Sequence, residues 1–176
     1  VTLFDTLEQA LSWQEQIYTS LPPLKNDEAL FGEQLLLDAT GKPAGYLDRL
    51  LLTSTDFSVD DVVQRVRELD GLCIPAHVDR TVYSIIANLG FIPPELEVVG
   101  VEISMNIGPV DARERFPQLA NYGLVASGDA HRLKEMVRRT TFKMAAPTVA
   151  EMASALQGID ERGVWVDGLW AGAPAC

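Results

Sequence analysis

Stretches with apolar residues at helical spacing alternate along the chain with short, continuous apolar runs. The clearest helical stretch covers residues 59–69, where apolar side chains recur every three or four positions after the capping pair Ser58 and Asp61. Comparable patterns predict helices at 6–20, 82–89 and 148–157 and a helical or irregular piece at 109–120. Further caps are expected from Asp5 with Glu8 and from Thr148 with Glu151, and Gly90 is expected to close the third helix.

The short apolar runs predict buried strands. They cover residues 1–4, 72–76, 98–104, 124–127, 140–144 and 163–166. Strands that alternate with helices at this spacing indicate an α/β fold with a mostly parallel sheet and helices packed outside it. Residues 31–50 predict a hairpin-like excursion that turns at Gly41. No repeat or linker interrupts the pattern, so a single domain over 1–176 is expected.

The charge balance of the chain is strongly acidic. Its 25 acidic and 14 basic residues give a formal net charge of −11 and a pI of about 4.5. Such a field repels nucleic acid, anionic membranes and phosphorylated substrates unless metal ions or arginines supply positive charge locally. We therefore expect no membrane partner and no sequence-specific nucleic acid. Because neither a membrane span nor a signal segment is visible, a cytoplasmic location is expected.

Both histidines of the chain follow predicted buried strands. His77 ends the run 72–76, and His131 follows the run 124–127 together with Asp129. Parallel strands deliver the side chains at their C-terminal ends to one cleft, so these three residues are expected to converge. An imidazole and a carboxylate suit zinc, manganese or iron. Two alternatives stay open, since His77 fits a hydrogen-bonded core histidine and Asp129 fits a turn cap.

Three charged residues near these candidates have two interpretations each. Glu102 ends the strand 98–104 and is either a polar group of the cleft or a paired structural acid. Arg80 and Arg132 each follow a candidate ligand closely and could bind phosphate oxygens through their planar guanidinium groups. An arginine in so acidic a chain can equally form a surface or structural ion pair.

An ordered series of motifs resembles the PHP family, the polymerase and histidinol phosphatase metallophosphoesterases. The resemblance extends from Val1 to Trp165, and a subset of the family also carries a region similar to Phe31–Gln34. The motifs that carry it are Ile74–Arg80, Tyr83–Ile86, Leu89–Pro93, Val101–Ser104 and Ser127–His131.

The resemblance implies a distorted (β/α)7 barrel that hydrolyses phosphoesters at a multinuclear site of zinc, manganese or iron. His77, Asp129 and His131 match metal-binding positions of the family, and a metal-activated water would attack the phosphoester. A small phosphorylated compound or a nucleotide is the expected substrate.

The sequence also departs from the family pattern. The first His-x-His motif, the following ligands and the first barrel strands have no counterpart here, so we expect an incomplete form of the enzyme. A non-catalytic remnant or interaction domain that keeps the PHP fold is the alternative. Missing strands would leave open sheet edges, which favours self-association.

Overall fold

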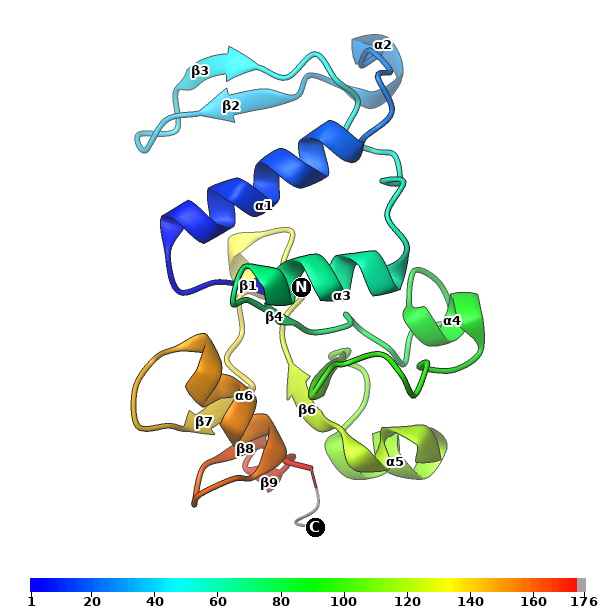
Figure 1. The fold of residues 1–176 in the computed structure, drawn as a ribbon. Helices are drawn as coiled ribbons and strands as arrows, with labels where there is room; N and C mark the ends of the chain where they lie inside the picture. Colours follow the sequence, from blue (N-terminus) through cyan, green and yellow to red (C-terminus); the bar gives the residue numbers. More distant parts are fainter. Residues whose placement is uncertain (174–176) are drawn as a thin grey trace.

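The computed structural model describes residues 1–173 of the chain, and Figure 1 shows the arrangement of its elements. Every helix in this part of the chain is too short or too polar to span a membrane. The helices are α1 (Leu7–Ser20), α2 (Glu28–Phe31), α3 (Val59–Glu68), α4 (Ile85–Leu89), α5 (Pro109–Arg115) and α6 (Val149–Gln157), with 3-10 turns η1 (Pro117–Asn121) and η2 (Leu133–Glu135). The strands are β1 (Thr2–Leu3), β2 (Leu35–Leu37), β3 (Pro43–Tyr46), β4 (Leu72–Cys73), β5 (Gly100–Ile103), β6 (Gly123–Ala126), β7 (Thr140–Lys143), β8 (Gly163–Val166) and β9 (Leu169–Trp170).

Side-chain caps decide where the first helices begin. The cap of α3 is confirmed, because Ser58 and Asp61 form a reciprocal capping box. The cap expected for α1 is wrong by one residue: Thr6 pairs with Gln9 there. Asp5 accepts a 2.8 Å hydrogen bond from the backbone amide of Val149, at the start of α6. A contact distant in sequence has thus taken the carboxylate away from the local cap.

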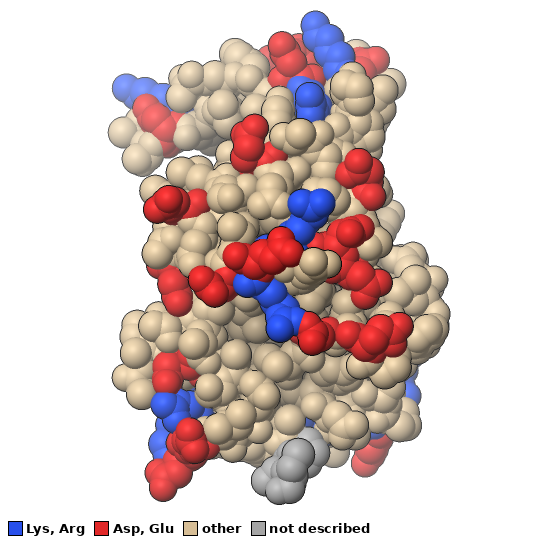
Figure 2. Space-filling model, in the orientation of Figure 1, with Lys and Arg blue, Asp and Glu red and all other residues tan. Residues whose placement is uncertain are grey.

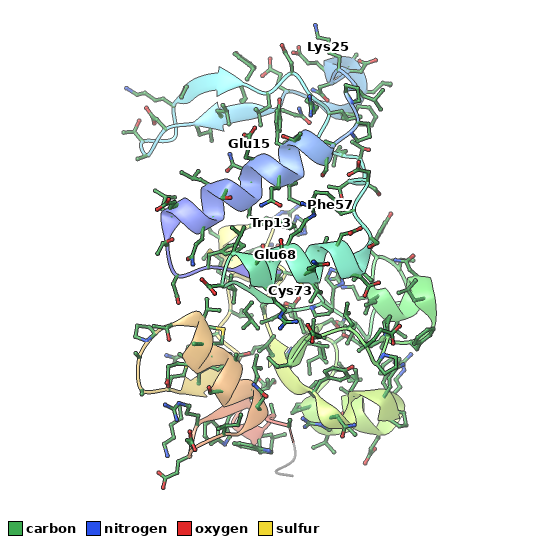
Figure 3. The ribbon with its side chains drawn as sticks, viewed as in Figure 1. Trp13, Glu15, Lys25, Phe57, Glu68 and Cys73 are labelled. Carbon is green, nitrogen blue, oxygen red and sulfur yellow. The ribbon has the colours of Figure 1, made fainter. Side chains whose placement is uncertain are left out.

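Helices α1 and α3 lie next to each other, and acidic side chains outnumber basic ones on the face they present in Figure 2. Trp13 is buried between the two helices and stacks on Phe57 with ring centroids 6.2 Å apart (Figure 3). The predicted hairpin is confirmed as β2 and β3, which lie beyond α1 in Figure 1. Its turn contains Gly41 at a φ of +81°, a backbone conformation that glycine adopts without strain.

The strands form four small sheets, and within residues 1–173 none closes into a barrel. The prediction of a mostly parallel sheet is wrong. Among the strands of residues 1–173, only β5 and β6 pair in parallel, whereas β1–β4, β2–β3 and β7–β8–β9 are antiparallel. A pattern of buried strands separated by helices does not record strand direction, and α6 brings β8 back against β7 in the antiparallel sense.

The segment after β4 extends along β5 and places His77 beside that strand. The amide of Glu102 donates to the carbonyl of Pro75, and the carbonyl of Glu102 accepts from the amide of Val78, both at 2.8 Å. The backbone between these bonds is irregular, because His77 lies between them in the left-handed region at a φ of +32°. Residues from the ends of β5 and β6 and from the segment after β4 therefore meet at one end of the β5–β6 pair. This agrees with the predicted convergence for His77 and Asp129 but not for His131, which faces solvent.

An ion pair fastens the start of α6 to the loop that follows the helix. Arg162 Nε and Nη2 each lie 2.6 Å from a carboxylate oxygen of Glu151, which lowers the pKa of Glu151 to about 2 from its ordinary value of 4.5. A carboxylate whose pKa is depressed on folding stabilises the protein above the unfolded value. That contribution is lost as the pH falls from about 4.5 toward 2.

We expect Glu151→Gln to lower the urea midpoint at neutral pH and to flatten its decline between about pH 4.5 and pH 2. The measurement is urea unfolding followed by circular dichroism across this pH range. Glu114→Gln is the matched control, because Glu114 is exposed and forms no ion pair among residues 1–173. Parallel pH profiles for the wild-type protein and Glu151→Gln would show that the ion pair contributes nothing measurable.

Candidate functional site

An open cavity of about 510 Å³ lies where the chain leaves β5 and β6. It contains two of the three predicted metal ligands, His77 and Asp129, together with the predicted cleft residue Glu102. The strand ends thus bring together side chains that are 25 to 52 positions apart in sequence. The complete lining is Val1, Ala76, His77, Glu102, Ser127, Gly128, Asp129, Ala130, Met136, Val137 and Arg138.

Glu102 connects the two segments that carry the candidate ligands. Its side chain is 5% exposed, and one carboxylate oxygen accepts a 3.2 Å hydrogen bond from the backbone amide of His77. The other oxygen accepts a short hydrogen bond from the hydroxyl of Ser127. A buried carboxylate is stabilised by such donors. Glu102 therefore lines the cavity and is also hydrogen-bonded to two neighbouring segments, so its position is compatible with both interpretations of the sequence.

His77 has two unusual features for a residue at the end of a strand. Its backbone has a φ of +32°, which a residue with a side chain adopts only where the surroundings enforce it. Its Nδ1 atom is buried and has no hydrogen-bond partner among residues 1–173, although buried polar atoms are normally paired. The second feature argues against the simple alternative of a hydrogen-bonded core histidine.

Asp129 also has a positive φ, of +44°, and its carboxylate is already engaged. Arg80 Nη2 lies 2.8 Å from Asp129 Oδ2, and both side chains are about one third exposed. His131 Nε2 lies 3.8 Å from Asp129 Oδ1, but the His131 side chain is 83% exposed and does not line the cavity. Arg80 thus forms an ion pair with a candidate ligand, whereas His131 faces solvent.

The described residues provide the types of ligand that the predicted metal site needs, but they do not provide enough of them. His77 and Asp129 offer a nitrogen and an oxygen donor, the kind that zinc, manganese or iron takes. Among residues 1–173, however, no three His, Cys, Asp or Glu side chains are placed to hold one ion. Catalytic zinc sites use three protein ligands, and His131 would have to turn inward to supply the third. Metal binding at His77, Asp129 and His131 therefore stays a prediction.

Ser127 and Arg138 are cavity residues that the sequence analysis did not assign. The sequence analysis counted Ser127 as the last residue of the predicted strand 124–127, whereas β6 ends at Ala126 and Ser127 directly follows it. Arg138 belongs to a basic cluster after His131, which the acidic total of the chain conceals. Its approach to the cavity depends on how the loop after β6 folds.

Arg139 fixes the end of this loop near β5. Its guanidinium donates to both carboxylate oxygens of Asp167 and, at 3.0 Å, to the carbonyl of Ser104. The hydrogen bonds from Arg139 lower the pKa of Asp167, which therefore remains a carboxylate. At the other end of the loop, the carbonyl of Glu135 lies so close to Gly128 that a Cβ at that position would collide with it.

Comparisons with known proteins give a structural likeness only. No family model and no curated protein sequence matches the chain. The solved structure of the lesion-specific endonuclease PfuEndoQ from Pyrococcus furiosus superimposes with a TM-score of 0.61 at 16% identity over 93% of this chain. Endonuclease Q in complex with a 27-mer duplex that carries an abasic lesion gives a TM-score of 0.58 at 16% identity over 92% of this chain. In both cases this chain spans 36% of the length of the other protein.

These neighbours overturn one expectation drawn from composition. From the acidic net charge we expected no sequence-specific nucleic acid, and the family resemblance implied a small phosphorylated compound or a nucleotide as substrate. This expectation about partners is contradicted, because the structural neighbours are endonucleases, one of them in complex with a duplex substrate. Endonuclease Q, whose fold this chain shares, is described in complex with a DNA duplex. Net charge is summed over the whole chain, whereas phosphate contacts depend on cations at one place on the surface. What the comparison establishes for this chain is its fold, which is PHP-like.

Proposed function

We propose that this chain carries the reactive pocket of a phosphodiester hydrolase that acts on damaged DNA. The observation behind the proposal is that one cavity combines an imidazole, two carboxylates and a hydroxyl, from His77, Asp129, Glu102 and Ser127. The PHP-like fold shared with a lesion-specific endonuclease supports DNA as the substrate class.

Hydrolysis of a phosphodiester joins a water oxygen to phosphorus, breaks the P–O bond to one sugar and delivers a proton to the leaving oxygen. In this proposal the His77 imidazole exchanges that proton, a role that imidazoles perform near neutral pH. Arg80 keeps N–H donors beyond the one that faces Asp129, and these bind the phosphate oxygens. Glu102 acts on the reaction only by holding His77 and Ser127 in position.

The proposal includes a divalent ion, with zinc, manganese and iron as candidates. Asp129 would provide a side-chain ligand, and water or phosphate oxygens would complete its shell. His77 would be a ligand only in the alternative three-ligand site with Asp129 and His131, in which it would not exchange the proton. Such an ion, when bound, lowers the pKa of a water ligand from 15.7 toward about 7.

The deciding experiment incubates the purified chain with labelled duplexes, each either intact or with one abasic site or one deaminated base. Manganese, zinc, iron or EDTA is added in parallel. We expect strand cleavage at the lesion with at least one metal, none in EDTA, and none with Asp129→Asn. Binding without cleavage under every metal condition would contradict the hydrolase proposal.

One observation favours a second candidate, a domain that binds DNA without cleaving it. Arg80 occupies the carboxylate of Asp129, and no three-ligand set is formed among the described residues. A guanidinium in the place of a metal ion would supply positive charge but would not activate water. Lesion-dependent binding that is unaffected by EDTA, without any cleavage, is the result that this candidate predicts.

A further inference from the structure

The segment Ala130–Arg138, which we call the rim loop, borders the cavity and has no role in the chemistry described so far. Met136, Val137 and Arg138 line the cavity beside His77 and Asp129. In Figure 1 the rim loop is the yellow segment near β1. Its position is set from both ends, by the tight approach of Glu135 to Gly128 and by the hydrogen bonds of Arg139.

The charge of this region is opposite to that of the rest of the chain. Residues 130–139 contain four basic residues and one acidic residue, whereas the whole chain contains 14 and 25. Arg132, Lys134 and Arg138 are exposed, and their side chains form no ion pair or hydrogen bond within residues 1–173. Each of these side chains could have found a partner in so acidic a chain. Arg138 lines the cavity, and Arg132 and Lys134 lie on the same loop. Three unpaired cations on a loop that borders a cavity therefore point to an anion that comes from outside.

The rim loop also exposes large apolar side chains. Leu133 is 88% exposed, the highest value for a large apolar residue within residues 1–173, and Met136 is 72% exposed. Leu133 opens the turn η2 and lies between Arg132 and Lys134 in sequence. An apolar side chain between two cations is suited to a nucleic acid, because the apolar side chain can contact the stacked bases while the cations contact the charged backbones on either side.

We propose that the rim loop is the DNA contact of this protein, with Arg132, Lys134 and Arg138 on backbone phosphates and Leu133 against the bases beside a lesion. The inference rests on the proposed function, because the cavity that the loop borders is the one assigned to the phosphodiester. An anionic lipid surface would also attract cations and apolar tips, but it would not explain why they border a cavity that contains an imidazole and carboxylates. A lesion weakens base stacking, which lowers the cost of inserting an apolar side chain there.

The first test measures binding of the full chain to a fluorescein-labelled abasic duplex by anisotropy at several salt concentrations. Each phosphate contact contributes about 0.9 to the slope of log K against log salt concentration. We expect R132A/K134A/R138A to lower the magnitude of the slope by about 2.7. The control K25A/K42A/R115A removes the same charge from exposed residues elsewhere and should leave the slope within about 0.5 of the wild-type value.

The second test places 2-aminopurine next to the abasic site and follows its fluorescence, which rises when stacking is disturbed. The wild-type protein should raise the signal, and Leu133→Ser should abolish the rise while the salt slope stays unchanged. Leu52→Ser is the matched control, because Leu52 is 72% exposed and lies on a different loop, between β3 and α3. Both leucines are solvent-exposed, so neither substitution is expected to unfold the chain.

The outcomes separate this inference from the proposed hydrolysis. Loop-dependent binding without cleavage keeps the DNA contact and rejects the hydrolase. Cleavage that is indifferent to both rim-loop variants keeps the hydrolase and overturns the DNA contact. An equal loss of slope in the control triple variant, or no DNA binding at all, also overturns it. So does rim-loop-dependent binding to phosphatidylserine vesicles when binding to the duplex does not depend on the loop.

Discussion

Replacing His77 with asparagine is expected to lower cleavage of an abasic duplex by about 100-fold or more, the usual contribution of a general acid or base. Asparagine tolerates the positive φ at this position, so the imidazole is removed without forcing the backbone to change. Alanine would remove the imidazole and also strain the backbone at this positive φ, so the two effects could not be separated. The measurement is single-turnover cleavage with saturating protein, accompanied by thermal unfolding and DNA binding of the same variant.

His131→Asn supplies the comparison that distinguishes two roles for His77. The His131 side chain is 83% exposed and lies outside the cavity lining, so this structure favours a much smaller loss than at His77. Equal losses at both positions, with a matching drop in bound metal, would instead support the three-ligand site that the family resemblance implies. Activity retained in His77→Asn would remove His77 from the mechanism.

Gly123→Ala is expected to destabilise the protein by about 1–3 kcal/mol or more, the typical cost of overpacking a core. An added Cβ on Gly123 would lie 2.5 Å from the carbonyl oxygen of Leu156 and 2.8 Å from its Cα. These are backbone atoms of α6, so no side-chain rotation can relieve the collision. Helix α6 would have to move away from β6, the strand that leads into Ser127 and Asp129.

Urea unfolding measures this effect, and Gly45→Ala is the matched control. Gly45 is also a strand glycine, but an added Cβ there would meet only the flexible Leu36 side chain, at 3.5 Å. Its change in unfolding free energy should stay within about 0.5 kcal/mol. A Gly123→Ala variant as stable as the Gly45→Ala control would show that α6 can shift without cost.

Local signals in the sequence located most elements because they are set by nearby residues. The Ser58 and Asp61 cap, the Gly41 turn and the left-handed Gly90 that ends α4 each involve residues a few positions apart. The same approach failed for Asp5, whose partner Val149 is 144 residues away. A local sequence pattern cannot show whether a carboxylate accepts its hydrogen bond from a neighbouring amide or from an amide that is distant in sequence.

For the candidate site, the sequence supplied the residues but not their partners. His77, Glu102 and Asp129 were singled out because each lies at or just after the end of a buried run, and the structure brings them to one cavity. That Arg80 pairs with Asp129, and that His131 faces solvent, could not be predicted. The first joins two segments that are distant in sequence, and the second depends on the path of the rim loop, which the spacing of apolar residues does not predict.

The sequence by itself determined where most helices and strands form, because capping, turn chemistry and hydrophobic spacing act over a few residues. It also determined that imidazole and carboxylate groups stand at the strand ends. Only the tertiary structure decided that the sheets are small and mostly antiparallel, which carboxylates are engaged, and that a loop rich in basic residues borders the cavity. Strand direction, ion pairing and local charge are relations between distant segments, and those relations exist only once the chain has folded.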